Sequence, residues 1–195
     1  MLKYSLIALL TAANVFSSSA ERIVFDMSVF GYKFGEMVLT RQVENDSIER
    51  FTLHATGKTD FFFMKREEQS IFKVEYRKGK LFSSDYEYLN RGVREKWSTI
   101  RLENGKYVVD SHEGRRQLSA PLDYSLIKLY FDPNWKRDRV FCEEDCTYAQ
   151  LTRTAKTLDV KCQNGNRSTY YLNNGRVEGM DIHLTVATVK LTRVN

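Results

Sequence analysis

Apolar and polar residues alternate along almost the whole chain, and this period-two pattern is the feature that most constrains the fold. In the first alternating run, Ile23, Phe25, Met27 and Val29 fall on one face of an extended segment. Because successive side chains of a strand point to opposite faces, the run predicts a strand buried on one side. Similar runs follow at Met37, Leu39 and Val43; Phe51, Leu53 and Ala55; Phe72, Val74 and Tyr76; Phe82, Tyr86 and Tyr88; Trp97, Ile100 and Leu102; Tyr107 and Val109.

The C-terminal third continues the pattern, with turn signals between its runs. Asn164-Gly165 and Asn174-Gly175 are typical of tight hairpin turns. Together the runs predict about eleven antiparallel strands at roughly ten-residue spacing, forming one curved sheet or barrel. With no linker or repeat in the sequence, we expect residues 21–195 to form a single β-barrel-like domain.

One segment departs from the alternation and has helical spacing instead. The residues Leu122–Phe131 place their apolar side chains on one helical stripe, and Pro133 cannot continue the helix. Ser119 or Asp123 can cap its first turn. We therefore expect a short helix of two to three turns that plugs one end of the curved sheet. The stripe consists of Leu122, Leu126, Leu129 and Tyr130.

The first 20 residues have the layout of a signal peptide. Lys3 precedes an apolar stretch from Leu6 to Val15, and Ser18 and Ala20 are small residues at the positions that signal peptidase requires. The alternative, an N-terminal membrane anchor, needs roughly 20 apolar residues, twice what this stretch offers. We expect cleavage after Ala20 and a soluble periplasmic or secreted protein with no transmembrane anchor.

Three cysteines remain after cleavage, so an oxidising compartment permits one bridge and one free thiol. If the chain turns near Lys156, Cys162 falls opposite about residue 150, several residues from Cys146. This arrangement favours a Cys142–Cys146 disulfide across a short acidic turn, with Cys162 as a buried free thiol. A redox or metal site is the alternative, although the spacing is not C-x2-C and no histidine is near.

Aromatic residues make up 13% of the chain and are its main chemical excess. Phe61, Phe62 and Phe63 are consecutive, so at least one side chain of such a strand must point away from the other two. We take these three residues as the candidate ligand-binding site. The alternative is a strand buried on both faces, or a loop folded over the barrel mouth.

The sequence shows no catalytic, metal or cofactor motif. It has no nucleophile elbow, phosphate-binding loop, zinc-protease pair or dinucleotide fingerprint. His54, His112 and His183 are the only histidines, and we expect them to be exposed or structural. The net charge of +5 is small and dispersed, and loss of Lys3 with the leader reduces it to +4, so nothing indicates a nucleic-acid partner.

Three short motifs resemble an uncharacterised family of exported Bacteroidota-type proteins, a domain of unknown function. They are Leu129–Pro133, Val140–Glu143 and Tyr170–Gly175, and the opening Gly31–Met37 is also similar. A sheet wrapped around a short helix is more distantly similar to periplasmic half-barrels that carry lipids or lipoproteins. That likeness implies a fold, and fold alone does not determine function.

These observations favour a non-enzymatic envelope protein that binds an apolar or amphipathic ligand such as a lipid. Ligand pockets are mostly apolar with few polar groups, which fits the aromatic excess without a catalytic set. One alternative is a protein-interaction module that recruits an envelope partner through exposed strand edges. A second is a hydrolase of envelope polymers, which would require carboxylates or histidines gathered in a cleft.

Overall fold

The computed structural model describes residues 19–44, 47–61, 64–119, 121–133 and 136–195. These residues form a single sheet of 14 strands and one helical turn, α1 (Leu126–Leu129). The first eight strands are β1 (Ser19–Val29), β2 (Tyr32–Glu44), β3 (Ile48–Phe61), β4 (Met64–Arg77), β5 (Lys80–Asn90), β6 (Val93–Glu103), β7 (Lys106–Ser111) and β8 (Gly114–Leu118). The strands after α1 are β9 (Arg139–Cys142), β10 (Thr147–Arg153), β11 (Thr157–Lys161), β12 (Arg167–Asn173), β13 (Arg176–His183) and β14 (Thr188–Arg193).

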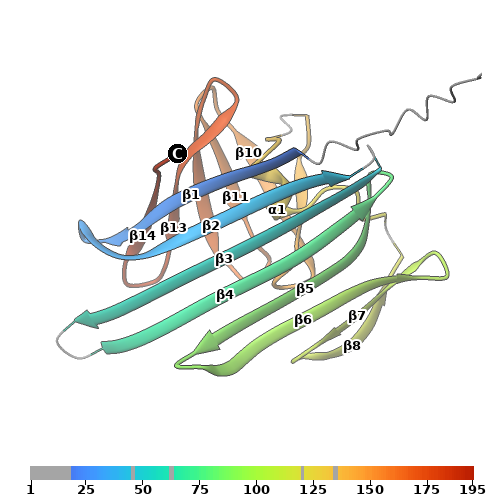
Figure 1. Cartoon of the computed structure of the whole chain (residues 1–195), viewed down its shortest axis with the longest axis horizontal. Coiled ribbons are helices and arrows are strands. Elements are labelled where there is room, and N and C mark those ends of the chain that lie inside the picture. Colours follow the sequence, from blue (N-terminus) through green and yellow to red (C-terminus); the bar gives the residue numbers. More distant parts are fainter. Residues whose placement is uncertain (1–18, 45–46, 62–63, 120, 134–135) are drawn as a thin grey trace, which may run out of the picture.

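Each strand pairs with the next along the chain, except that β8 does not pair with β9. The first strand, β1, also pairs with the last strand, β14. All the pairs between neighbouring strands are antiparallel. The two unpaired edges of the curled sheet are therefore β8 and β9, which follow one another in the sequence on either side of α1. Figure 1 shows the long strands β1 to β6 as one broad layer, with the C-terminal strands behind it and α1 between the two parts. The predicted antiparallel curved sheet is confirmed.

The interior of the curled sheet is filled by its own side chains. The inward-facing side chains of the N-terminal strands pack against those of β9 to β14 and against Ile127 and Leu129 of α1. Just after α1, the Tyr130 ring centroid lies 6.0 Å from that of Phe25 and 5.5 Å from that of Tyr170. This residue thus joins the first strand to the C-terminal strands through aromatic contacts.

The helix is shorter than the predicted two to three turns, because the residues before it form backbone hydrogen bonds to strands of the sheet. Leu122 accepts a hydrogen bond from the Leu81 N–H, and Tyr124 accepts one from the Phe141 N–H. Ser125 makes an isolated parallel bridge to Phe141. The helix therefore begins after Ser125, not after Ser119 or Asp123. The predicted apolar stripe nevertheless faces the core, with Leu122, Leu129 and Tyr130 buried and Leu126 half-buried.

The prediction of about eleven strands was too low. The strands β8 and β9 lack a readable alternation, because β8 has the sequence Gly-Arg-Arg-Gln-Leu and β9 has only four residues. Both are edge strands, and a short or charged edge is a common protection against unwanted pairing. The strand β1 begins at Ser19, two residues before the predicted cleavage site. After cleavage, the first residue pair between β1 and β2 would be Glu21 and Arg41.

The antiparallel order places the turns after odd-numbered strands at one end of the barrel. We call this the cavity end. It carries the β1–β2, β5–β6 and β13–β14 turns, and β3 ends there at Phe61 (Figure 1). Within the described ranges, no helix has the length and apolar character needed to cross a membrane.

Candidate functional site

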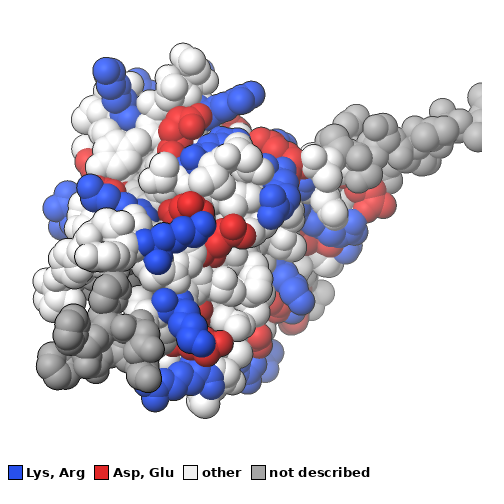
Figure 2. All heavy atoms as spheres, turned by 60° about the vertical axis from the view of Figure 1, so that its left-hand side comes forward, with Lys and Arg blue, Asp and Glu red and all other residues white. Residues whose placement is uncertain are grey.

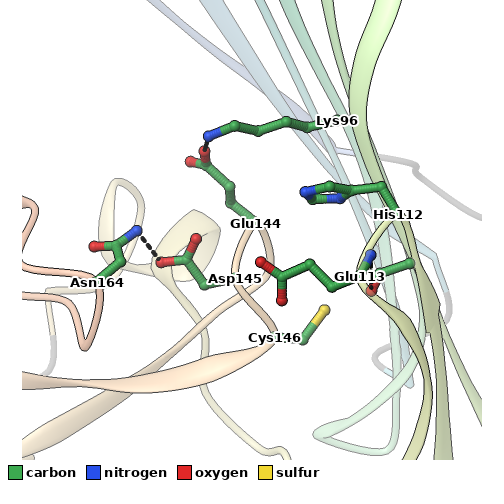
Figure 3. A pocket seen from close by; sticks show the side chains of 8 residues that line it. Lys96, His112, Glu113, Glu144, Asp145, Cys146 and Asn164 are labelled. Atoms are coloured by element: carbon green, nitrogen blue, oxygen red, sulfur yellow. Dashed lines mark hydrogen bonds and ion pairs between the residues drawn. The ribbon is translucent and has the colours of Figure 1, made fainter.

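A cavity of about 190 Å³ lies at the cavity end, where the unpaired edges β8 and β9 approach each other. Its wall comes from the start of β6 and from three turns, β7–β8, β9–β10 and β11–β12 (Figure 3). The lining residues are Lys96, Ser111, His112, Glu113, Glu144, Asp145, Cys146 and Asn164.

Side-chain bonds, not strand pairing, hold the two edges together around this cavity. Arg116 of β8 donates hydrogen bonds to the carbonyls of Asp145 and Cys146, at 2.8 and 3.1 Å. The Lys96 Nζ lies 3.6 Å from a carboxylate oxygen of Glu144. These contacts bind the β9–β10 turn to the N-terminal half of the sheet and so fix the position of its carboxylates.

The cavity is predominantly acidic. Three carboxylates, from Glu113, Glu144 and Asp145, face one lysine and His112. Burial raises the pKa of Glu144, and the neighbouring Asp145 charge adds to the effect while Lys96 opposes it. Burial also raises the pKa of Asp145, although Lys96 and a 2.7 Å hydrogen bond from the Asn164 amide act in the opposite direction. The arrangement suits a cationic or hydrogen-bond-donating group.

His112 is tied to the cavity wall by its ring. Its Nδ1 lies 3.1 Å from the carbonyl oxygen of Trp97, and the His112 backbone N–H donates to the same oxygen. The exposed position of His112 agrees with the sequence analysis, as do those of His54 and His183. Among the described residues, no group of three or more His, Cys, Asp or Glu side chains is arranged to hold a metal ion.

Glu143, the residue before the cavity carboxylates, points into the protein interior and is 1% exposed. Its carboxylate accepts a hydrogen bond from the Ile127 N–H at the start of α1, and its carbonyl accepts one from the Ser98 hydroxyl. The Tyr76 hydroxyl donates to Ser125 Oγ at 2.7 Å, beside the same carboxylate. Burial raises the pKa of Glu143 from 4.5 to about 7, against the effect of its hydrogen-bond donors.

All three cysteines carry free thiols, so the predicted Cys142–Cys146 disulfide is not found in the structure. The Cys142 sulfur lies 3.4 Å from the Cys162 sulfur, while the Cys146 thiol points to the Glu143 carbonyl oxygen at 3.5 Å. The predicted position of Cys162 is confirmed, because Lys161 pairs with Gln150. Cys162 has the predicted free thiol but is half-buried and not buried as expected, and its thiol contacts Cys142 across β10.

The candidate aromatic site lies at the β3–β4 hairpin. Phe61 is the last residue of β3, and Phe62 and Phe63 are outside the described residues. The structure thus places the end of β3 at the same end of the barrel as the cavity.

Exposed apolar residues also gather at the cavity end. Phe30, at the β1–β2 turn, is 78% exposed, and Val186, at the β13–β14 turn, is 81% exposed. The pairing of Val29 with Val189 brings these two turns side by side. Exposed Tyr32, Val93 and Leu184 belong to the same end.

Charged residues are dispersed over this side of the molecule. Figure 2 turns the side with the hairpin tips toward the viewer and shows Lys and Arg interspersed with Asp and Glu, with uncharged surface between them. Contacts made here by the exposed apolar tips would therefore depend little on long-range charge.

Sequence reasoning missed most of the cavity residues. It recognised the acidic turn between Cys142 and Cys146 only as a staple, and it recognised Asn164 only as part of a hairpin signal. Lys96 comes from β6, while Glu113 and Asp145 come from two different turns, and their meeting depends on closure of the sheet. The one available signal was the density of acidic residues in the Cys142–Cys146 turn.

Comparisons with known proteins identify the family and the fold. No curated protein is significantly similar in sequence. A crystal structure of a β-barrel-like protein of domain of unknown function DUF1849 from Brucella abortus is similar in fold, with a TM-score of 0.53 and 13% sequence identity. The similarity covers 89% of this chain and 95% of that chain. Residues 25–194 match DUF6134, a domain of unknown function, and the chain belongs to that family.

Proposed function

We propose that this protein is an exported, non-enzymatic binding protein that takes an apolar or amphipathic ligand such as a lipid at its cavity end. The observation that carries the proposal is the conformation and exposure of Phe30. Its side chain is 78% exposed. Its φ is +51°, in a backbone region that residues other than Gly, Asn and Asp rarely adopt. The exposure of this large apolar ring is unfavourable unless something covers it, and the positive φ gives no local reason for an aromatic residue at this position.

Four other hairpin turns of the same protein provide an internal comparison. Each has a residue with φ of +49° to +50° followed by a glycine, as in the Phe30-Gly31 turn. In these four turns the first residue is polar: Lys78, Arg91, Asn104 and Asn174. Of these five described turns, the β1–β2 turn alone has an aromatic residue at this position, and it lies beside the turn of the exposed Val186. Exposed apolar clusters of this kind are typical of binding surfaces.

The filled interior supports a binding surface on the outside of the barrel. The buried rings of Phe25, Tyr130 and Tyr170 contact one another in the centre of the fold, which leaves less room there for an apolar ligand. The hairpin tips supply the apolar surface, while the acidic cavity at the same end supplies polar groups. An amphipathic molecule carries both kinds of group, which supports it over a purely apolar ligand.

Substitution of Phe30 by asparagine tests this proposal. We expect binding of the mature protein to phosphatidylcholine vesicles to weaken about tenfold, because the variant loses the burial of one aromatic side chain. The free energy of unfolding should stay the same or rise by about 1 kcal/mol, because asparagine tolerates a positive φ. Vesicle co-sedimentation and urea denaturation measure the two effects.

Lys78→Asn is the matched control. It makes the same type of change at the same turn position, but at the opposite end of the barrel. Vesicle binding by this variant should equal that of the unsubstituted protein. Equal binding by all three proteins, or no binding by any, would contradict the proposal. If the unsubstituted protein captures a protein partner and the Phe30→Asn variant does not, that result would instead support the alternative of a protein-interaction module.

The cavity carboxylates favour a second candidate, a hydrolase of envelope polymers. Burial raises the pKa of Glu144, and a carboxyl group with a raised pKa can serve as a general acid beside the adjacent Asp145. If the protein releases soluble fragments from purified envelope polysaccharide, Glu144→Gln should reduce the rate more than tenfold. Absence of released fragments with the unsubstituted protein would eliminate this candidate.

A further inference from the structure

The Cys142 and Cys162 thiols lie close together at the ends of two different strands. Cys142 ends β9 and pairs with Thr147 of β10, while Cys162 directly follows β11, whose Lys161 pairs with Gln150 on the other side of β10. Curvature of the sheet brings the two sulfurs to 3.4 Å across β10. A disulfide bond is about 2.05 Å long, so roughly 1.4 Å of approach separates the thiols from a bond.

Cys146 is placed differently, although it is nearer to Cys142 in sequence. The backbone of Cys146 has a φ of +52°, and its thiol points to the Glu143 carbonyl oxygen. Its own carbonyl is held by Arg116 of β8. A bond from Cys142 to Cys146 would require this turn to give up its contacts, whereas a bond to Cys162 would shorten an existing contact.

We propose that Cys142 and Cys162 are an oxidation site and form a disulfide bond that links β9 to the end of β11. Cys162 is half-buried and Cys142 is 1% exposed, so an oxidant reaches Cys162 first. The hydrogen bond from Cys142 lowers the pKa of the Cys162 thiol and raises that of Cys142, which agrees with Cys162 as the attacking thiolate.

The oxidant is a second disulfide, either a small molecule or a thiol–disulfide oxidase. The Cys162 thiolate attacks one of its sulfur atoms, forming a mixed disulfide and releasing one thiol after proton uptake. Cys142 then loses its proton and attacks the Cys162 sulfur, which releases the second thiol. Two protein thiols are oxidised while one disulfide is reduced to two thiols. The bond fixes the edge strand β9, which leads into the turn that carries Glu144 and Asp145.

Tryptic mapping of the whole protein after incubation with oxidised glutathione distinguishes the possible pairs. Cys142 and Cys146 share the peptide 140–153, between Arg139 and Arg153, whereas Cys162 lies in the peptide 162–167. After alkylation of free thiols, we expect a cross-linked pair of these two peptides that reductant abolishes. A bond from Cys142 to Cys146 would instead appear within the peptide 140–153, and that result would overturn the proposal.

Variants identify which cysteine of the longer peptide takes part. The disulfide should also raise the unfolding temperature, because it restricts the unfolded chain. Cys146→Ser should keep both the cross-link and this rise on oxidation, while Cys162→Ser should lose both. Loss of the cross-link in Cys146→Ser while the protein remains folded would assign the bond to Cys146 and overturn the proposal. Three alkylated cysteines in the unsubstituted protein after oxidation would also overturn it, and this measurement needs no variant to fold.

Discussion

Replacing Leu129 by alanine is expected to lower the free energy of unfolding by about 3 kcal/mol, because it opens a hole in the filled interior. Leu129 is 0% exposed and belongs to α1, the single helical turn inside the curled sheet. The neighbouring Tyr130 ring is held by Phe25 and Tyr170, so the surrounding residues have little freedom to close the hole. Urea denaturation of the two proteins measures the difference.

Leu126→Ala is the matched control, since it makes the same substitution in the same helix. Leu126 is only half-buried, so its loss should cost less than half as much. Benzene should raise the unfolding temperature of Leu129→Ala alone, because an apolar cavity of this kind stays dry and binds small apolar molecules. Equal stability losses in the two variants would show that the interior is not filled around Leu129 as described.

The alternation of residues predicted the sheet well where a strand has one buried face. Phe25 and Met27 of β1, and Phe51 and Leu53 of β3, all belong to the buried core as their spacing predicted. The antiparallel arrangement followed from the short turns between the runs. These features are local, so they can be read from neighbouring residues.

The missed features depend on contacts between distant segments. The helix is short because residues 122–125 bond to Leu81 and Phe141, which no local pattern reveals. The cavity exists because the edges β8 and β9 meet when the sheet closes. The contact between Cys142 and Cys162 likewise depends on the curvature of three strands, whereas the expected pairing of two strands favoured a bond between Cys142 and Cys146.

Between pH 4.5 and about 7, the unsubstituted protein is expected to lose about 3 kcal/mol of stability because of Glu143. Burial raises the pKa of this carboxyl from 4.5 to about 7, so the folded protein keeps the proton where the unfolded chain has released it. The stabilising contribution of the proton is therefore complete below the unfolded pKa and is lost as the pH rises through the folded value. Glu143→Gln should remove this part of the pH dependence.

The comparison of pH profiles separates the charge of Glu143 from its hydrogen bonds. Glutamine keeps an acceptor oxygen for the Ile127 N–H, so the variant should be more stable than the unsubstituted protein above pH 7. Tyr76→Phe removes the hydroxyl that donates to Ser125 and changes no titrating carboxyl. It should lower stability by about 1 kcal/mol at every pH and retain the slope. An unchanged slope in Glu143→Gln, measured by urea denaturation from pH 4.5 to 8, would show that another group accounts for the loss. A reduced slope in that variant alone would show that closure of the sheet over α1 buries a carboxyl that strongly favours its protonated form.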